Sequence, residues 1–357
     1  MRLPNRPATV LGAIYIPVLS IVWYADAAHA AAAQHGGHQA VPLPSQESLA
    51  GITHGATQGV AAFLAGLVVF TALVWLPVSR AENAEGEKAA GLFCRWMWVL
   101  AGLLVVTGLV ELPVYAMRAS GESLSSGLLA EALYDTRVGQ LWVLRVSLGF
   151  FVAAAATYAI RRRSPVYWWG AACIAAVMPM TLTRQSHAAT EGGFLPLAAD
   201  WLHVVAASVW MGGLLGFPIL LTAPPLEMPA DARAKLLGRT VRRFSKVATG
   251  AVTALLITGS YAILLHVPNL PALTGTAYGN ALIVKLGLLV LLLAAGAVNL
   301  VSRGRGPFGH VVRLELVLAI CVFVATGFLT TLPPSDAEQA TVRDDGTGLA
   351  KNASQLP

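Results

Sequence analysis

The chain has 357 residues, of which 56% are hydrophobic and only 12% are charged, and its formal net charge is +6. Soluble domains carry about 25% charged residues, so this composition excludes a soluble enzyme. The positive charge lies mainly in short segments between apolar runs, which indicates membrane topology and not a nucleic-acid-binding surface. We therefore expect the lipid bilayer, and no nucleic acid, as a partner.

The first apolar run has the pattern of a signal peptide. Arg2 and Arg6 precede the apolar residues 10–24, and the small residues Ala28-His29-Ala30 and Ala30-Ala31-Ala32 follow. We expect a signal peptide at 1–32, with an uncleaved anchor as the alternative. Either interpretation places the next residues outside the cytoplasm.

A periplasmic segment with two histidines, His35 and His38, is expected at 33–51. Cleavage after Ala32 leaves Ala33-Gln34-His35 as the mature start. An amine, two amide nitrogens and a third-position imidazole form a square-planar chelate suited to Cu(II). A linker that merely contains histidines is the alternative.

Eight further runs are long enough to cross a membrane, which takes about 20 mainly apolar residues. They are 52–78, 92–114, 138–160, 166–183, 200–222, 245–266, 281–302 and 314–332. Lipid cannot satisfy a bare backbone N–H or C=O, so each run is expected to be helical. The predicted fold is an all-α polytopic membrane bundle of about eight transmembrane helices after an N-terminal signal peptide.

The loops predict the organisation and the orientation. We expect five spans in 52–222, a cytoplasmic basic loop at 223–244, three spans in 245–332 and a disordered periplasmic tail at 333–357. Fifteen Lys and Arg flank the spans on the side of the basic loop and five on the other side. The positive-inside rule then predicts a bacterial inner-membrane protein with both mature termini in the periplasm.

Four histidines map to the outer side of these spans. His54 begins the first span, His187 follows the fourth, His203 lies one turn into the fifth, and His266 ends the sixth. Imidazole is a common ligand of copper and other transition metals, so this pattern favours an outer metal site. For any one of them, an ordinary interfacial histidine is the alternative.

Sulfur and carboxylate groups lie close to these histidines in the sequence. Met178 and Met180 precede His187, and thioether sulfur selects Cu(I). Packing in the helix bundle is the alternative for both methionines. Asp200 shares a helix face with His203. It is expected either to orient that imidazole or to cap the helix N-terminus.

Three charged residues, Glu111, Arg145 and Lys285, fall within predicted spans. An unpaired charge at this depth is costly, so each is expected to face the bundle interior and find a partner. We expect Glu111 to pair with Arg145 or Lys285. A proton or ion pathway is the alternative.

Several motifs together resemble the CopD copper-resistance family over roughly residues 50–335. They are ADWLHVVAASVWMGGLLGF at 199–217, SHAAT at 186–190, TRVGQLWVLR at 136–145, RRFSKVATGAVTALLITGSYAIL at 242–264, GTAYGNALIVKLGLLVLLLAAGAVN at 275–299 and RLELVLAICVFVATGFLTTLPP at 313–334. The resemblance implies a non-enzymatic protein that moves copper from periplasm to cytoplasm, often beside a periplasmic CopC-type carrier. It implies His187 and His203 as ligands, with Asp200 and Trp210 as neighbours.

Two other functions stay open at this point. Two imidazoles on different helices can ligate haem, so a membrane cytochrome using the same outer histidines is one alternative. The other is a copper-binding assembly or sensory protein that transports nothing. The chain has no GxxxxGK[ST] segment, so we expect no ATP hydrolysis by the chain itself.

Overall fold

The computed structural model describes residues 46–81, 86–222, 229–267, 269–302 and 308–332. These residues form helices and no strand, and eight of their helices are long and apolar enough to cross a membrane. The predicted all-α polytopic membrane bundle is therefore confirmed. The predicted signal peptide, His35, His38 and the C-terminal tail lie outside the described residues.

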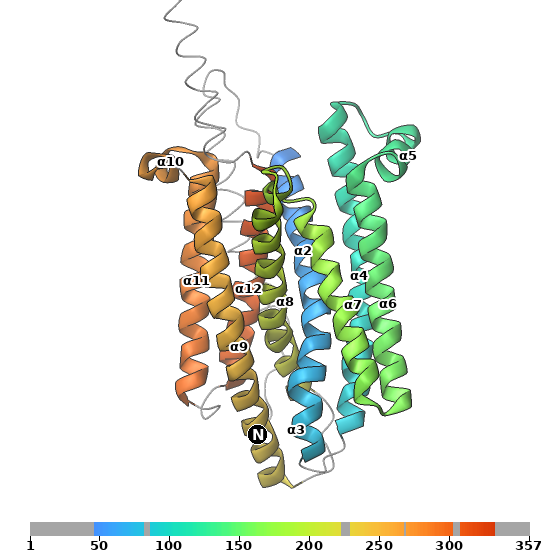
Figure 1. Ribbon diagram of the computed structural model, residues 1–357, viewed down its shortest axis with the longest axis vertical. Coiled ribbons are helices and arrows are strands. Elements are labelled where there is room, and N and C mark those ends of the chain that lie inside the picture. Colours follow the sequence, from blue (N-terminus) through green and yellow to red (C-terminus); the bar gives the residue numbers. More distant parts are fainter. Residues whose placement is uncertain (1–45, 82–85, 223–228, 268, 303–307, 333–357) are drawn as a thin grey trace, which may run out of the picture.

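The spans follow one another along the chain with short connections (Figure 1). The first is α2 (Gln46–Val69), the π-helix η1 (Phe70–Trp75) and α3 (Leu76–Ala81). Next come α4 (Gly86–Ser120), the short α5 (Ser126–Tyr134), α6 (Arg137–Arg162) and α7 (Pro165–Thr183). A 3-10 turn, η2 (His187–Ala189), precedes α8 (Phe194–Thr222), α9 (Ala230–His266), α10 (Leu270–Gly275), α11 (Ala277–Ser302) and α12 (Phe308–Thr331).

Two helix starts differ from the sequence prediction. Residues 230–244, expected as part of a basic loop, form the first turns of α9. This segment is rich in Ala, Leu, Lys and Arg, which favour helix, and nothing obliges a helix to stop at the membrane surface. Likewise α8 begins at Phe194, so Asp200 lies inside that helix and does not cap it. A 37-residue helix such as α9 is about 55 Å long and exceeds the roughly 30 Å hydrocarbon layer.

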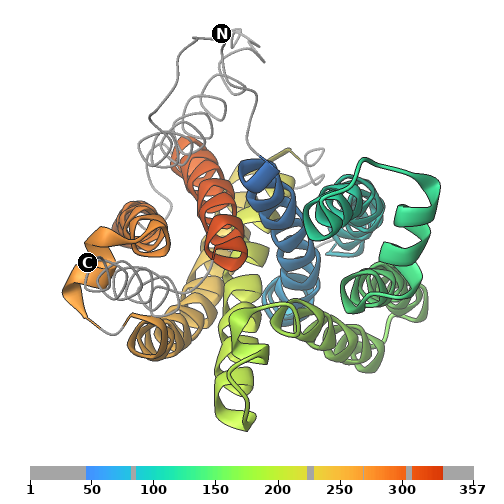
Figure 2. The same ribbon diagram turned by 90° about the horizontal axis from the view of Figure 1, so that it is seen from above.

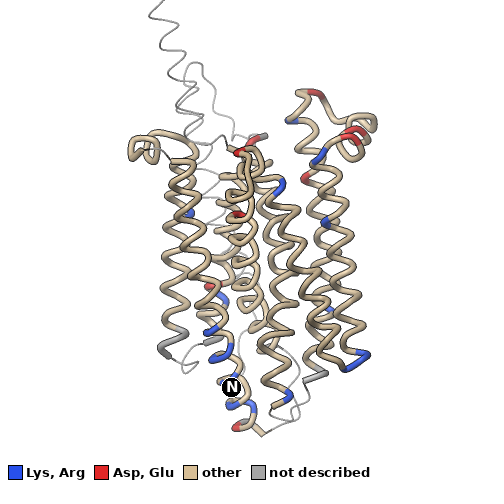
Figure 3. The backbone as a smooth tube through the Cα atoms, viewed as in Figure 1, with Lys and Arg blue, Asp and Glu red and all other residues tan. Residues whose placement is uncertain are grey.

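The two ends of the bundle differ in charge, as Figure 3 shows. Lys and Arg gather at the end where α9 starts, which we call the basic end. The ends of α3 and α6 and the first turns of α9 place there Arg80, Arg161, Arg162, Arg163, Arg233, Lys235, Arg239, Arg242 and Arg243. The opposite end, where α2 and α8 start and α7 and α9 finish, carries the four predicted histidines. We call it the histidine end.

Helix α2 lies at the centre of the bundle, as the view from above shows (Figure 2). It packs against α12, α8, α4 and α7. Helices α4 to α7 form one side of the molecule, and α9 to α11 form the other. Large apolar side chains on the outer helices are exposed, among them Leu109, Phe151, Leu264 and Val290. Such a surface suits lipid contact.

Glycines bring α2 into close contact with α8 and α12. A Cβ built at Gly66 would lie 1.9 Å from the Ser208 carbonyl oxygen, and one at Gly327 would lie 2.0 Å from the Gly51 carbonyl oxygen. Membrane helices gain no hydrophobic driving force against lipid, so close van der Waals packing at small residues holds them together. These contacts fix the central helix.

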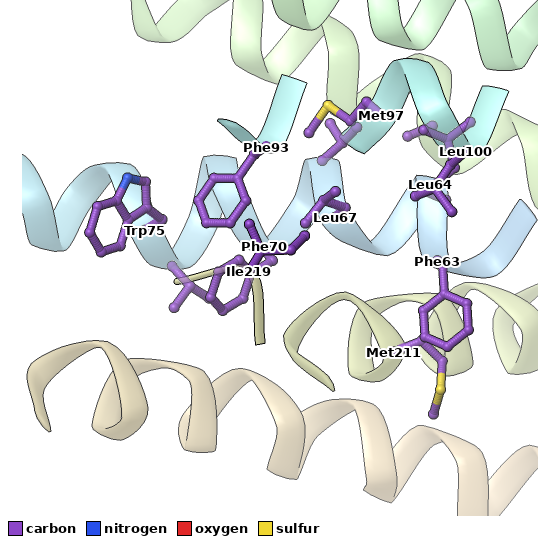
Figure 4. Packing of buried hydrophobic residues seen from close by; sticks show 14 of the residues in the cluster. Phe63, Leu64, Leu67, Phe70, Trp75, Phe93, Met97, Leu100, Met211 and Ile219 are labelled. Atoms are coloured by element: carbon purple, nitrogen blue, oxygen red, sulfur yellow. The ribbon is translucent and has the colours of Figure 1, made fainter. Parts of the chain in front are cut away.

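Large apolar side chains fill the basic half of the bundle (Figure 4). Phe70 of η1 makes edge contacts with Phe93, Phe217 and Phe244, with ring centroids 5.4–6.0 Å apart. Trp75, at the end of η1, is fully buried against Phe93. This half of the described core is mainly apolar, with Thr71, Ser79, Thr240 and Glu315 as buried polar side chains. The polar groups of the candidate site lie nearer the histidine end.

Candidate functional site

Two of the predicted histidines face each other at the histidine end. The ring centroids of His187 and His266 are 6.1 Å apart, and Tyr278 lies 6.3 Å from each. The three rings come from η2, the last residue of α9 and the start of α11. Three segments that are distant in sequence thus form one aromatic cluster, which we call the His187–His266 pair with Tyr278.

Local sequence fixes each member of this cluster. Gly192 and Gly193 have positive φ values of 74° and 85°, which lets the chain turn from η2 into α8. His266 ends α9 because Val267 is extended, and in the sequence a proline follows at 268. The Thr276 hydroxyl accepts a hydrogen bond from the Gly279 N–H (3.0 Å) at the start of α11, next to Tyr278.

A hydrogen bond indicates the tautomer of His187, and a nearby carboxylate bears on that of His266. His187 Nε2 lies 3.2 Å from the Leu329 carbonyl oxygen, which only accepts, so Nε2 carries the proton and Nδ1 holds the lone pair. His266 Nδ1 lies 3.6 Å from a carboxylate oxygen of Glu191, which favours a proton on Nδ1. Outer partners of this kind orient metal-ligating histidines.

The carboxylate of Asp200, on α8, acts electrostatically on His266 of this pair. Asp200 Oδ2 accepts a hydrogen bond from Ser186 Oγ (3.0 Å), and Asp200 is close enough to interact electrostatically with Lys285 and His266. Lys285 of α11, which the sequence had offered as a partner of Glu111, thus acts electrostatically on Asp200. His54 and Arg145 act on Glu111 instead. Ionisable residues inside the membrane are rare and usually mark functional sites.

His203 lies one turn further into α8 and is separate from the pair. Its Nδ1 is 2.9 Å from the Thr258 hydroxyl, whose own proton goes to the Ala254 carbonyl (2.7 Å). Thr258 therefore accepts, and Nδ1 of His203 donates. The oxygen that orients His203 thus comes from α9, whereas the sequence had offered Asp200 for that role.

His54 belongs to a different polar group. Its Nδ1 lies 2.5 Å from Glu111 Oε1, and its Nε2 lies 3.0 Å from Gln58 Nε2. Both ring nitrogens are thus engaged, so we leave His54 out of the copper site. Arg145 acts electrostatically on Glu111 and is fully buried. The direct partner of Glu111 is thus His54. Arg145, the predicted partner, acts on Glu111 at longer range.

Arg145 is held by helix α7 and the turn after it. Its Nε donates to Thr181 Oγ1 (2.9 Å), and one terminal nitrogen donates to the Thr181 carbonyl (3.2 Å) and to Gln185 Oε1. Gln185 in turn donates to the Val138 carbonyl (3.4 Å). Such a network satisfies a cation that lipid could not solvate.

The predicted sulfur ligands and Trp210 lie mainly in the packed interior. Met178 is fully buried in the main apolar core, and Met180 is half-buried on the same helix. Trp210 also belongs to that core. These positions favour packing for Met178 and Trp210. Across the described ranges, no three His, Cys, Asp or Glu side chains gather closely enough to form a ready-made metal site.

Haem between His187 and His266 would have to displace Tyr278, which packs on both rings. A small ion could bind between the two imidazoles without displacing Tyr278. The arrangement therefore suits an ion held by two imidazoles better than a macrocycle held by them.

Sequence reasoning missed several polar partners. Gln58 lies four residues after His54, a spacing that places both on one helix face, so it was open to detection. Tyr278, Glu191 and Thr258 carried no such pattern. Their contacts with the histidines depend on how α9 and α11 pack, and the spacing of residues in the sequence does not predict that packing.

Comparison with known proteins gives two matches to family models. Residues 238–329 match the model described as copper resistance protein D, and residues 45–197 match the copper resistance protein D-like N-terminal domain. Together these matches cover more than half of the chain. The residues between the two matches, 198–237, include most of α8 and the start of α9.

Two curated relatives are similar over about three fifths of the chain. "Copper transport protein CutJ" of Bacillus subtilis is 29% identical over 220 residues, covering 60% of this chain and 40% of that protein. "Copper resistance protein D" of Pseudomonas syringae pv. tomato is 27% identical over 240 residues, covering 61% of this chain and 76% of that protein. The match thus spans less than half of the B. subtilis protein. No solved structure matches significantly.

Proposed function

The chain belongs to the copper resistance protein D family, and on that premise we propose that it takes up copper at the histidine end and passes it toward the basic end. The positive-inside rule makes the basic end cytoplasmic, so the histidine end faces the periplasm of a bacterial inner membrane. Copper then moves from periplasm to cytoplasm. A periplasmic carrier of the CopC type would deliver its copper at the histidine end.

The observation that carries this proposal is the His187–His266 pair. Its two imidazoles belong to separate segments and meet with ring centroids 6.1 Å apart. Imidazole suits copper, and His187 has a hydrogen-bond partner in the Leu329 carbonyl while Glu191 lies 3.6 Å from His266. Side-chain rotation is enough to bring both rings onto one ion.

A site with two imidazoles suits passage better than storage. Conduction needs binding that is favourable enough for entry and weak enough for exit. The absence of a third closely placed ligand in the described residues fits that requirement. Copper held there lies next to Asp200, and His203 is one helical turn deeper. We propose these two residues as the next contacts on the route.

Lys285 gives this route a barrier. Its ammonium interacts with Asp200 and lies close to His203. A copper cation that reaches Asp200 replaces Lys285 as the partner of that carboxylate. We therefore propose that Lys285 neutralises the site when it is empty and resists the passage of other cations.

The test is the copper content of the detergent-purified protein. We expect wild type to retain copper through desalting and a His187→Ala/His266→Ala variant to lose it, since both imidazoles are gone. His310→Ala is the matched control, because His310 is exposed near the basic end. It should keep the wild-type copper content.

Two results would count against the proposal. Copper retained in full by the double variant would place the site elsewhere. A Soret band that disappears in the double variant would assign the two histidines to haem.

A further inference from the structure

We propose that His54, Glu111 and Gln58 form an intramembrane proton-binding site, and that its proton is exchanged as copper passes. The coupling to copper rests on the proposed function, whereas the proton site stands by itself. The three side chains come from α2 and α4, away from the His187–His266 pair. They are buried, with 13% of the His54 side chain and 11% of the Glu111 side chain exposed.

With the Gln58 amide nitrogen turned toward His54, the hydrogen bonds fit a neutral imidazole. The Gln58 amide nitrogen only donates, so the His54 Nε2 at 3.0 Å is the acceptor. The proton of the ring is therefore on Nδ1, which donates to Glu111 Oε1 at 2.5 Å. A carboxylate paired with a neutral imidazole can take up one more proton without a change of backbone.

Two buried acceptors at this place have no donor. Glu111 Oε2 and Gln58 Oε1 are both buried and lack a hydrogen-bond partner. Thr57 lies beside Glu111, but its hydroxyl donates to the Thr53 carbonyl (3.1 Å). Buried acceptors are nearly always satisfied, so the orphan Gln58 Oε1, on the amide that contacts the imidazole, indicates that a further hydrogen can bind there.

A proton on His54 Nε2 supplies that hydrogen. The lone pair that accepts from Gln58 forms the new N–H bond, and the proton comes from water at the periplasmic side. Rotation of the Gln58 amide by half a turn then places Oε1 opposite the new N–H. The amide group is symmetric in shape, so both protonation states fit the same cavity.

The charges around this site come from few groups. Arg145 of α6 acts on Glu111, and α7 contributes the polar Thr181 and Gln185, which bind Arg145. Helix α8 contributes Asp200 and His203, which are engaged with Ser186 and Thr258. Helix α12 contributes Glu315 nearer the basic end, and Cys321 close to the level at which Gly55 and Gly59 of α2 meet Phe323.

With Arg145 balancing Glu111, the group is neutral when the imidazole is neutral and cationic when it is protonated. A copper cation entering the same bundle repels the imidazolium. Arrival of copper therefore favours loss of the proton, which makes exchange of copper for a proton the expected coupling.

The first measurement needs no copper. Nuclear magnetic resonance of the apo protein labelled with ¹⁵N at histidine is expected to show a buried imidazole that changes protonation with pH. The His54→Gln variant should lack that signal, since glutamine keeps a hydrogen-bonding amide but cannot titrate. If the His54 signal stays neutral throughout the pH range in which the protein is folded, the proton site does not exist.

The second measurement follows copper uptake into proteoliposomes that contain a pH-sensitive dye. We expect copper to drive a pH change in wild type, and Glu111→Gln to lose that change while retaining bound copper in detergent. Glu131→Gln, which alters an exposed carboxylate on α5, is the control and should behave as wild type.

Copper uptake without a pH change in wild type would overturn the coupling and leave the proposed function standing. A pH change that persists in Glu111→Gln would overturn the assignment of the site. Copper retained by the His187→Ala/His266→Ala variant would instead count against the proposed function.

Discussion

An Arg145→Met variant is expected to lose about 3–5 kcal/mol of unfolding free energy, the cost of removing one partner from a buried charged network. Arg145 is 1% exposed and donates to Thr181 and Gln185. Methionine fills much of the volume but donates nothing. Glu111 then loses a nearby positive charge, and Gln185 loses its donor.

The measurement is denaturant- or heat-induced unfolding in detergent, followed by circular dichroism. Arg161→Met is the matched control, because Arg161 lies at the exposed basic end of the same helix. Its stability should stay within about 0.5 kcal/mol of wild type, as for most surface substitutions. Equal losses in the two variants would contradict the role given to Arg145.

A Gly66→Ala variant is expected to separate α2 from α8 and to lower the unfolding free energy by about 1–3 kcal/mol, the usual cost of overpacking. The added Cβ would meet the Ser208 carbonyl oxygen at 1.9 Å and the Gly212 nitrogen at 2.6 Å. These are backbone atoms, so no side-chain rotation relieves the clash.

Gly102→Ala, on α4, is the control for this prediction. A Cβ at Gly102 meets nothing within 4 Å. Alanine favours helix over glycine by about 0.5–1 kcal/mol, so this variant should be neutral or more stable. The two substitutions should therefore move the unfolding midpoint in opposite directions. A shift of the same sign in both would contradict the close contact between α2 and α8.

The sequence was sufficient for the membrane fold because the physical constraint is strong. Lipid forces every span to satisfy its own backbone, so hydropathy alone locates the helices. Helix ends were less well predicted. Residues 230–244 are polar enough to suggest a loop, yet they continue α9, since a helix is stable on both sides of the membrane surface when its residues favour it.

The sites were predicted less completely than the fold. The position of each histidine along its helix was enough to predict that His54, His187, His203 and His266 lie at one end of the bundle. It was not enough to predict which of them are in contact. Which rings meet depends on the rotation of each helix about its axis. That rotation is set by packing contacts such as Gly66 with Ser208, which leave no trace in the spacing of the histidines. Lys285 likewise comes within electrostatic reach of Asp200 through the way α11 packs against α12.

X-ray absorption spectroscopy of the copper-loaded protein shows whether copper is bound between His187 and His266. We expect nitrogen neighbours at about 2 Å with the outer scattering of imidazole, as for metal–histidine bonds in general, and loss of this pattern in His266→Ala. Sulfur neighbours at about 2.3 Å, the length of a metal–sulfur bond, would contradict it. They would place copper on methionine or cysteine and not on the two histidines.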